Sequence, residues 1–142
     1  MIRTQISVLA LVLICACTPS ATLISRTTGA VGKGTVENAT MGNSGPLTIS
    51  FKNESYSGQW VAVPNPGSYN FGLLNAYGGG TSAYGNFSSY SVSDSGFGTA
   101  ILSSNKGNSM RCEFRYNTMS MTAIGVCQKQ NGEVFDLQVV TS

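Results

Sequence analysis

The chain has 142 residues, of which only 10% are charged, and its formal net charge at pH 7 is +2. This length fits one domain. The chain contains 17 glycines and no histidine. Histidine is the commonest metal ligand and a frequent general base, so we expect neither a metal nor another cofactor. The basic residues are scattered along the chain, and nucleic acid is therefore not an expected partner.

The N-terminal segment resembles an export signal. Residues 6–16 are apolar except for Ser7 and follow a short positive segment that contains Arg3. A helix that spans a bilayer needs about 20 apolar residues. The run is too short for that and is typical of the hydrophobic part of a secretory signal.

The apolar run ends in Ile14-Cys15-Ala16-Cys17, which resembles the lipobox of bacterial lipoproteins. The resemblance implies that residues 1–16 are a signal peptide, that Cys15 leaves with it, and that Cys17 becomes the lipidated first residue. Thr18 stands where inner-membrane lipoproteins carry Asp, which by analogy implies the outer membrane of a Gram-negative envelope. Two or more acyl chains attach a protein stably, so the membrane is an expected partner.

Residues 17–45 are rich in Thr, Gly, Ser and Asn and poor in large apolar side chains. This composition predicts a lipidated N-terminus followed by a tether. A β domain is then expected over residues 46–142.

Strands are predicted from residue 47 onward, where hydrophobic residues begin to alternate with polar ones. The predicted strands cover residues 47–52, 56–63, 96–103, 109–116, 121–130 and 133–140. Asn131-Gly132 predicts a two-residue type I′ hairpin, which would pair Ile124 with Val139 and Val126 with Leu137. The expected fold is all-β: a single antiparallel meander of about six to eight strands, as a small barrel or a two-layer sheet.

Residues 65–95 combine Gly, Ser and Asn with regularly spaced aromatic residues. They fit either a long loop with a stacking surface or short strands whose aromatic side chains join the core. Long structureless loops are uncommon in compact domains, which favours the strands. Tyr56, Trp60, Tyr77 and Tyr84 are candidates for an aromatic contact surface, although Trp60 also fits a core position.

Cys112 and Cys127 are predicted to form a disulfide, because an exported chain meets an oxidising compartment. If the two cysteines lie directly opposite each other, Arg115 falls beside Ile124. That pairing conflicts with the apolar face of the predicted hairpin. A bulge within residues 117–125, an offset between the cysteines, or partial covering of both sheet faces would each resolve the conflict.

Cys112-Glu-Phe114, Gly125-Val-Cys-Gln and Phe135-Asp-Leu137, with Gly132 between the last two, resemble the ends of small uncharacterised Gram-negative outer-membrane lipoproteins. No Gly-x-Ser-x-Gly motif and no carboxylate spacing typical of a glycosidase is present. We therefore expect a non-enzymatic envelope lipoprotein that is structural or binds an envelope protein or peptidoglycan. The alternative is a small β-barrel inhibitor, for example of a muralytic enzyme, or a ligand-binding module.

Overall fold

The computed structural model describes residues 17–39, 42–64 and 95–141, and this part of the chain forms eight β-strands. The strands are β1 (Ser20–Ser25), β2 (Val31–Val36), β3 (Ser44–Ser50), β4 (Ser55–Pro64), β5 (Ser95–Ser104), β6 (Ser109–Asn117), β7 (Thr122–Lys129) and β8 (Val134–Val140). Within the described residues, no helix is long and apolar enough to cross a membrane.

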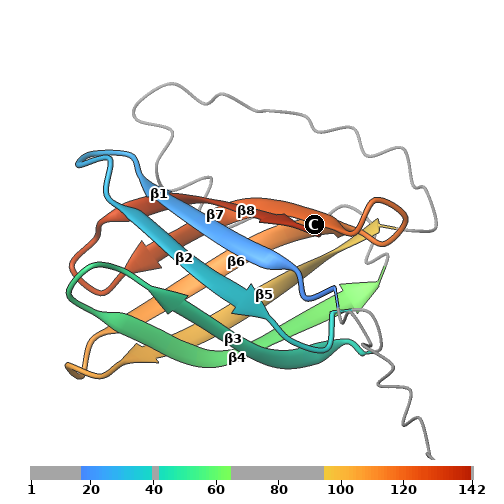
Figure 1. Ribbon diagram of the computed structural model, residues 1–142, viewed down its shortest axis with the longest axis horizontal. Helices are drawn as coiled ribbons and strands as arrows, with labels where there is room; N and C mark the ends of the chain where they lie inside the picture. Colours follow the sequence, from blue (N-terminus) through green and yellow to red (C-terminus); the bar gives the residue numbers. More distant parts are fainter. Residues whose placement is uncertain (1–16, 40–41, 65–94, 142) are drawn as a thin grey trace, which may run out of the picture.

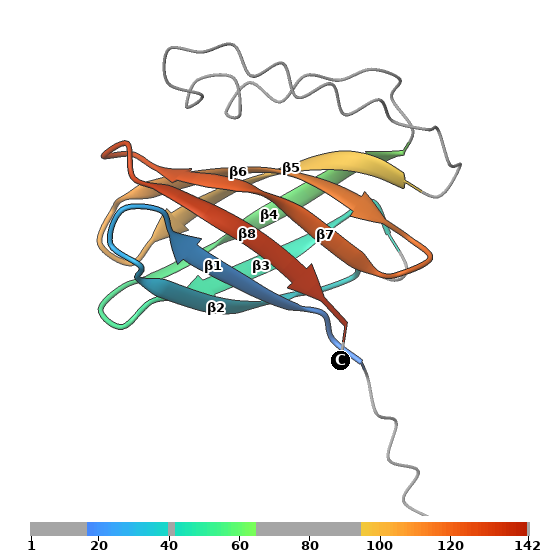
Figure 2. The same cartoon turned by 90° about the horizontal axis from the view of Figure 1, so that it is seen from above.

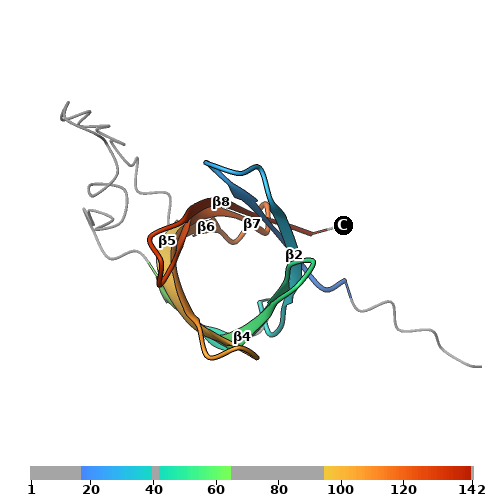
Figure 3. The same ribbon diagram turned by 90° about the vertical axis from the view of Figure 1, so that its left-hand side faces the viewer.

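The strands form a closed antiparallel barrel in meander order (Figures 1 and 3). Each strand pairs with the next along the chain, and β1 closes the barrel by pairing with β8. The predicted all-β meander is confirmed, and it is a barrel rather than a two-layer sheet. An eight-stranded barrel has an interior just wide enough for side chains or for one small ligand.

The two ends of the barrel differ. The closed end carries the β1–β2, β3–β4, β5–β6 and β7–β8 turns, which lie together in Figure 2. The mouth end carries the β2–β3 connection, the β6–β7 turn, the start of β1 and the end of β8. Large side chains crowd the closed half of the interior, where Phe51, Tyr56 and Phe135 are in contact.

The prediction of a tether over residues 17–45 is wrong. These residues contain β1 and β2, which complete the barrel between β8 and β3. The hydrophobic pattern of β2 was hidden because Gly32 and Gly34 occupy two of its inward positions. A Cβ on Gly32 would lie 2.7 Å from the Phe51 ring, and one on Gly34 would lie 1.7 Å from the carbonyl oxygen of Thr48. The glycines are needed because the barrel wall is closely packed here.

The β7–β8 hairpin is one residue longer than predicted. The Lys129 amide donates to the Glu133 carbonyl at 2.9 Å, and the Gly132 amide donates to the Lys129 carbonyl at 2.9 Å. Gly132 has φ +91°. These features define a three-residue loop with glycine in the left-handed region. Because side chains alternate along a strand, the shift of one residue reverses the predicted face of β7.

The new register removes the predicted conflict around the cysteines. Cys112 lies directly opposite Cys127, and Ile124 opposes Gln138 rather than Val139. Ile124 therefore faces outward and is 59% exposed. Val126 also points away from the interior but is only 3% exposed, so the outer face of β7 is partly covered.

Candidate ligand-binding cavity

A cavity of about 310 Å³ occupies the mouth half of the barrel interior. Ligand-binding pockets commonly have volumes of about 300–1,000 Å³. The cavity arises because several inward positions near the mouth carry small residues, among them Ala62 on β4 and Ala123 on β7. The closed half of the interior is filled by bulkier side chains and contributes little to it.

The cavity wall is apolar, and its largest side chains come from β4 and β6. Trp60 is 5% exposed, and its Nε1 donates a hydrogen bond to the Glu37 carbonyl oxygen at 2.9 Å. This bond satisfies the indole N–H and holds the ring against the β2–β3 connection. Further wall residues are Val36, Leu47, Ala62, Phe114, Leu137 and Val139.

The Phe114 ring packs against glycines on the two neighbouring strands, where no side chain competes for the space. Phe114 lies opposite Gly98 on β5 and Gly125 on β7. A Cβ on Gly98 would lie 2.4 Å from Cζ of Phe114, so the ring covers this glycine directly. The close approach fixes the ring as one wall of the cavity.

The polar groups of the cavity are amides and hydroxyls. Asn43, Asn117, Thr118 and Thr122 contribute to the lining near the mouth. Asn117 is oriented by its Oδ1, which accepts a hydrogen bond from the Ser120 amide at 2.9 Å. Among the residues that the structure describes, none that lines the cavity carries a formal charge.

Tyr116, the penultimate residue of β6, also lines the cavity. Burial raises the pKa of Tyr116 above its usual value near 10. Its phenol is therefore protonated and neutral at physiological pH. The cavity offers apolar surface and neutral hydrogen-bonding groups, which suits an uncharged, largely apolar molecule.

The closed end is plugged by Lys129, which is an inward-facing residue at the end of β7. Its Nζ lies 4.4 Å from the ring centroid of Phe51, 4.9 Å from that of Phe135 and 5.6 Å from that of Tyr56. Nζ also lies 3.8 Å from Oε2 of Glu133. The ammonium group is thus enclosed by three rings and one carboxylate, which accounts for a lysine inside the barrel wall.

Glu133 is held by hydroxyl groups of the β1–β2 region. Its Oε1 accepts hydrogen bonds from Ser25 Oγ at 2.7 Å and Thr28 Oγ1 at 3.1 Å. Ser25 is itself buried. The carboxylate therefore ties the β1–β2 turn to the β7–β8 hairpin, which is a structural role at the end remote from the cavity.

The aromatic residues and the cysteine that the sequence analysis singled out do not form one common site. Tyr56 is only 1% exposed and lies in the closed half, so it is not part of a contact surface. Trp60 faces the interior and lines the cavity. Tyr77 and Tyr84 lie outside the described residues, as does nearly all of the segment over residues 65–95. Cys17 has an exposed, unpaired thiol.

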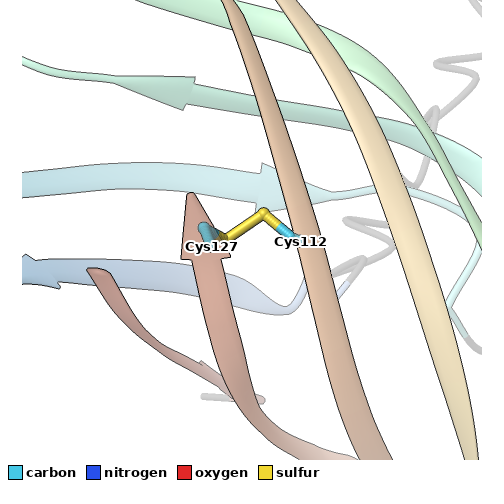
Figure 4. Close-up of a disulfide and its surroundings, with 2 residues drawn as sticks. All are labelled: Cys112 and Cys127. Carbon is cyan, nitrogen blue, oxygen red and sulfur yellow. A yellow bond between two sulfur atoms is a disulfide. The ribbon is translucent and has the colours of Figure 1, made fainter. Parts of the chain in front are cut away.

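The predicted disulfide is present. Cys112 on β6 and Cys127 on β7 are bonded, and their Cα atoms are 4.0 Å apart (Figure 4). Both cysteines are completely buried inside the barrel. The bond joins adjacent strands between the plugged end and the cavity, so its role is structural.

Sequence reasoning missed the cavity itself. Ala62, Phe114 and Val139 carry no motif, and they meet only because the barrel closes. One feature of the sequence points toward the cavity: small and large residues alternate on β4–β6, so that Gly98 comes to lie opposite Phe114. In residues 17–39, 42–64 and 95–141, no three His, Cys, Asp or Glu side chains gather in a way that could hold a metal ion.

Comparison with known proteins yields no family model, no curated protein and no solved structure that matches the chain.

Proposed function

We propose that this chain is a non-enzymatic, lipid-anchored protein of the Gram-negative envelope, on the outer membrane, whose barrel binds an apolar ligand in the mouth cavity. The cavity of about 310 Å³, whose described lining residues carry no charge, is the observation that carries the proposal. It favours a ligand-binding module over a purely structural protein, because a barrel without a ligand could fill its interior with side chains at both ends.

The anchor is supported by the lipobox-like residues that end at Cys17. Cys17 is two residues before Pro19, which lines the cavity at the mouth end. The non-enzymatic role is supported by the lack of histidine in the sequence and by a cavity lining without charged side chains among the described residues. The chemistry that remains at the cavity is binding.

The anchor is tested by the intact mass of protein extracted from membranes after expression of the full chain. We expect a mature species that begins at a lipidated Cys17. We expect a Cys17→Ser variant to lack the lipid mass. A wild-type species that begins elsewhere, or that carries no lipid, refutes the anchor.

Ligand binding is tested with N-phenyl-1-naphthylamine, a neutral apolar fluorophore. Trp60 is the chain's single tryptophan and lines the cavity, so energy transfer from its indole reports dye that binds to the barrel, and variants of the cavity wall locate the dye. Ala62→Phe fills part of the cavity and should weaken binding, by about tenfold or more. Val61→Phe is the matched control because Val61 directly precedes Ala62 on β4 but faces outward, with 49% exposure.

Wild-type protein that does not bind the dye at micromolar concentration refutes the ligand-binding function. Equal affinities of the two phenylalanine variants would place the dye outside the cavity and refute the assignment of the site. If Ala62→Phe does not fold, Ala123→Leu, which narrows the cavity from β7, replaces it. Inhibition of lysozyme by the wild-type protein, without dye binding, would instead favour the inhibitor.

A further inference from the structure

The positions of Cys17 and of the charged side chains bear on which ligand the mouth cavity accepts and from which side it enters. We propose that the cavity receives a single uncharged acyl chain, which comes from the lipid phase at the mouth end. This inference rests on the proposed function and narrows it to one ligand class and one route.

The direction of access follows from the position of the anchor residue. Pro19 lines the cavity, and Cys17 is separated from it by one residue. Two extended residues span at most about 7 Å. A lipid on Cys17 therefore holds the mouth end, rather than the closed end, against the membrane surface. An acyl chain can then reach the cavity without crossing water.

The closed end cannot serve as a second way in. Lys129 fills it, with its ammonium group between the Phe51, Tyr56 and Phe135 rings. Leu102 and Met110 are fully buried in the same half of the interior. In the part of the chain that the structure describes, the apolar interior is therefore filled at the closed end and accessible from the mouth end, which suits a linear chain that inserts lengthwise.

The preference for an uncharged ligand follows from the distribution of cations. Arg26, Lys52 and Lys106 lie in turns of the closed end, and Lys129 is enclosed there. Lys33 lies opposite Ser50, the last residue of β3, and Arg111 lies opposite Gln128, close to the same end. Residues 65–94 contain no lysine or arginine at all.

Arg115 is the one described cation in the mouth half, and it faces outward on β6, opposite the exposed Ile124. A carboxylate head group at the mouth would therefore lose part of its hydration without a cationic partner among the described residues, which is unfavourable. An uncharged ester, amide or hydroxyl head group loses much less free energy on desolvation. It can use Asn43 or Thr122 at the mouth as hydrogen-bonding partners.

Two sources can supply this chemistry: an acyl chain of the lipid on Cys17 itself, or a chain of a separate neutral lipid. The probe for both is monoolein brominated across its double bond, because bromine quenches tryptophan fluorescence on contact and Trp60 is the single tryptophan. Brominated oleate at pH 8 is the charged counterpart with the same chain. Both probes are titrated into wild-type protein and into the Cys17→Ser variant, each expressed as the full chain.

We expect brominated monoolein to quench Trp60 in Cys17→Ser with an affinity at least about tenfold higher than that of brominated oleate. Ala62→Phe should weaken the neutral probe by a similar factor, while the outward-facing Val61→Phe should not. If the anchor's own chain occupies the cavity, lipidated wild-type protein resists quenching. If a separate lipid is the ligand, both proteins are quenched alike.

Equal or tighter binding of the oleate anion would overturn the preference for an uncharged chain. Absence of quenching by both acyl probes, while the naphthylamine dye still binds, would overturn the acyl-chain ligand but leave the binding function intact. Absence of dye binding as well would refute both. Quenching that is equal in Ala62→Phe and Val61→Phe would place the chain outside the cavity and also overturn the proposal.

Discussion

The closed end of the barrel depends on Lys129, and replacing this residue tests how the charge and the aliphatic stem contribute. Its ammonium group contacts three aromatic rings and lies 3.8 Å from a Glu133 oxygen, and the side chain is 17% exposed. Lys129→Met keeps an unbranched side chain over the rings but removes the charge. Lys129→Ala removes the charge and the stem.

The magnitude follows from these contacts. A cation–π contact contributes about 0.5–2 kcal/mol, depending on how far it is desolvated. An ion pair with this partial exposure adds at most about 1 kcal/mol. The thioether of methionine recovers part of the loss through its own contact with the rings, so Lys129→Met should destabilise the fold by about 1–2 kcal/mol. Loss of the stem costs a further 2 kcal/mol, roughly, so Lys129→Ala should cost about 3–4 kcal/mol.

The measurement is the free energy of unfolding in urea at pH 7, with Tm as a second readout. Lys106→Met is the matched control because Lys106 is exposed in the β5–β6 turn at the same end, and its change should stay within about 0.5 kcal/mol. If Lys129→Met and Lys106→Met unfold with the same free energy, the enclosed ammonium group does not stabilise the barrel and the reasoning fails.

Three further predictions concern the disulfide, a buried tyrosine and a glycine. Replacing both Cys112 and Cys127 by alanine should lower the free energy of unfolding by about 3 kcal/mol, as measured in urea, because their bond closes a short loop. Burial, with a hydrogen bond to Glu54, raises the pKa of Tyr56 to about 12. The neutral phenol therefore stabilises the fold below pH 10, and this contribution is lost as the pH rises from 10 toward 12. Unfolding of Tyr56→Phe should lack this part of the pH dependence, and an unchanged profile would count against it. Gly98→Ala places a Cβ 2.4 Å from the Phe114 ring, so urea unfolding should show a loss of about 1–3 kcal/mol.

Several parts of the fold could be predicted because they depend on neighbouring residues alone. Alternation in residues 47–52 and 109–116 marked β3 and β6, and it identified the buried faces that contain Ile49 and Cys112. The disulfide followed from the expected compartment and from adjacent strands. The class of the fold was accessible for the same reason, since strands separated by short turns form a meander.

Other parts could not be predicted because they depend on contacts between distant residues. The hydrophobic alternation of β2 could not be detected because Gly32 and Gly34 occupy inward positions. The space beside them is filled by Phe51 and by the backbone of β3. The β7–β8 loop was misjudged because Asn131-Gly132 fits both a two-residue and a three-residue turn. The pairing of Cys112 with Cys127 turns Cys127 toward the barrel interior. Cys127 then lies opposite the inward-facing Phe135, and this register requires the three-residue loop.

The sequence by itself determined that this is an all-β chain with one internal disulfide and no histidine chemistry, because composition and alternation are properties of local segments. Only the tertiary structure decided that β1 and β2 close a barrel, that Lys129 plugs one end and that a cavity is left at the other. Trp60, Ala62 and Phe114 line that cavity only after β4 and β6 are brought together around β5. The volume of the cavity is set by the closure of the barrel and by which of its inward positions carry small side chains.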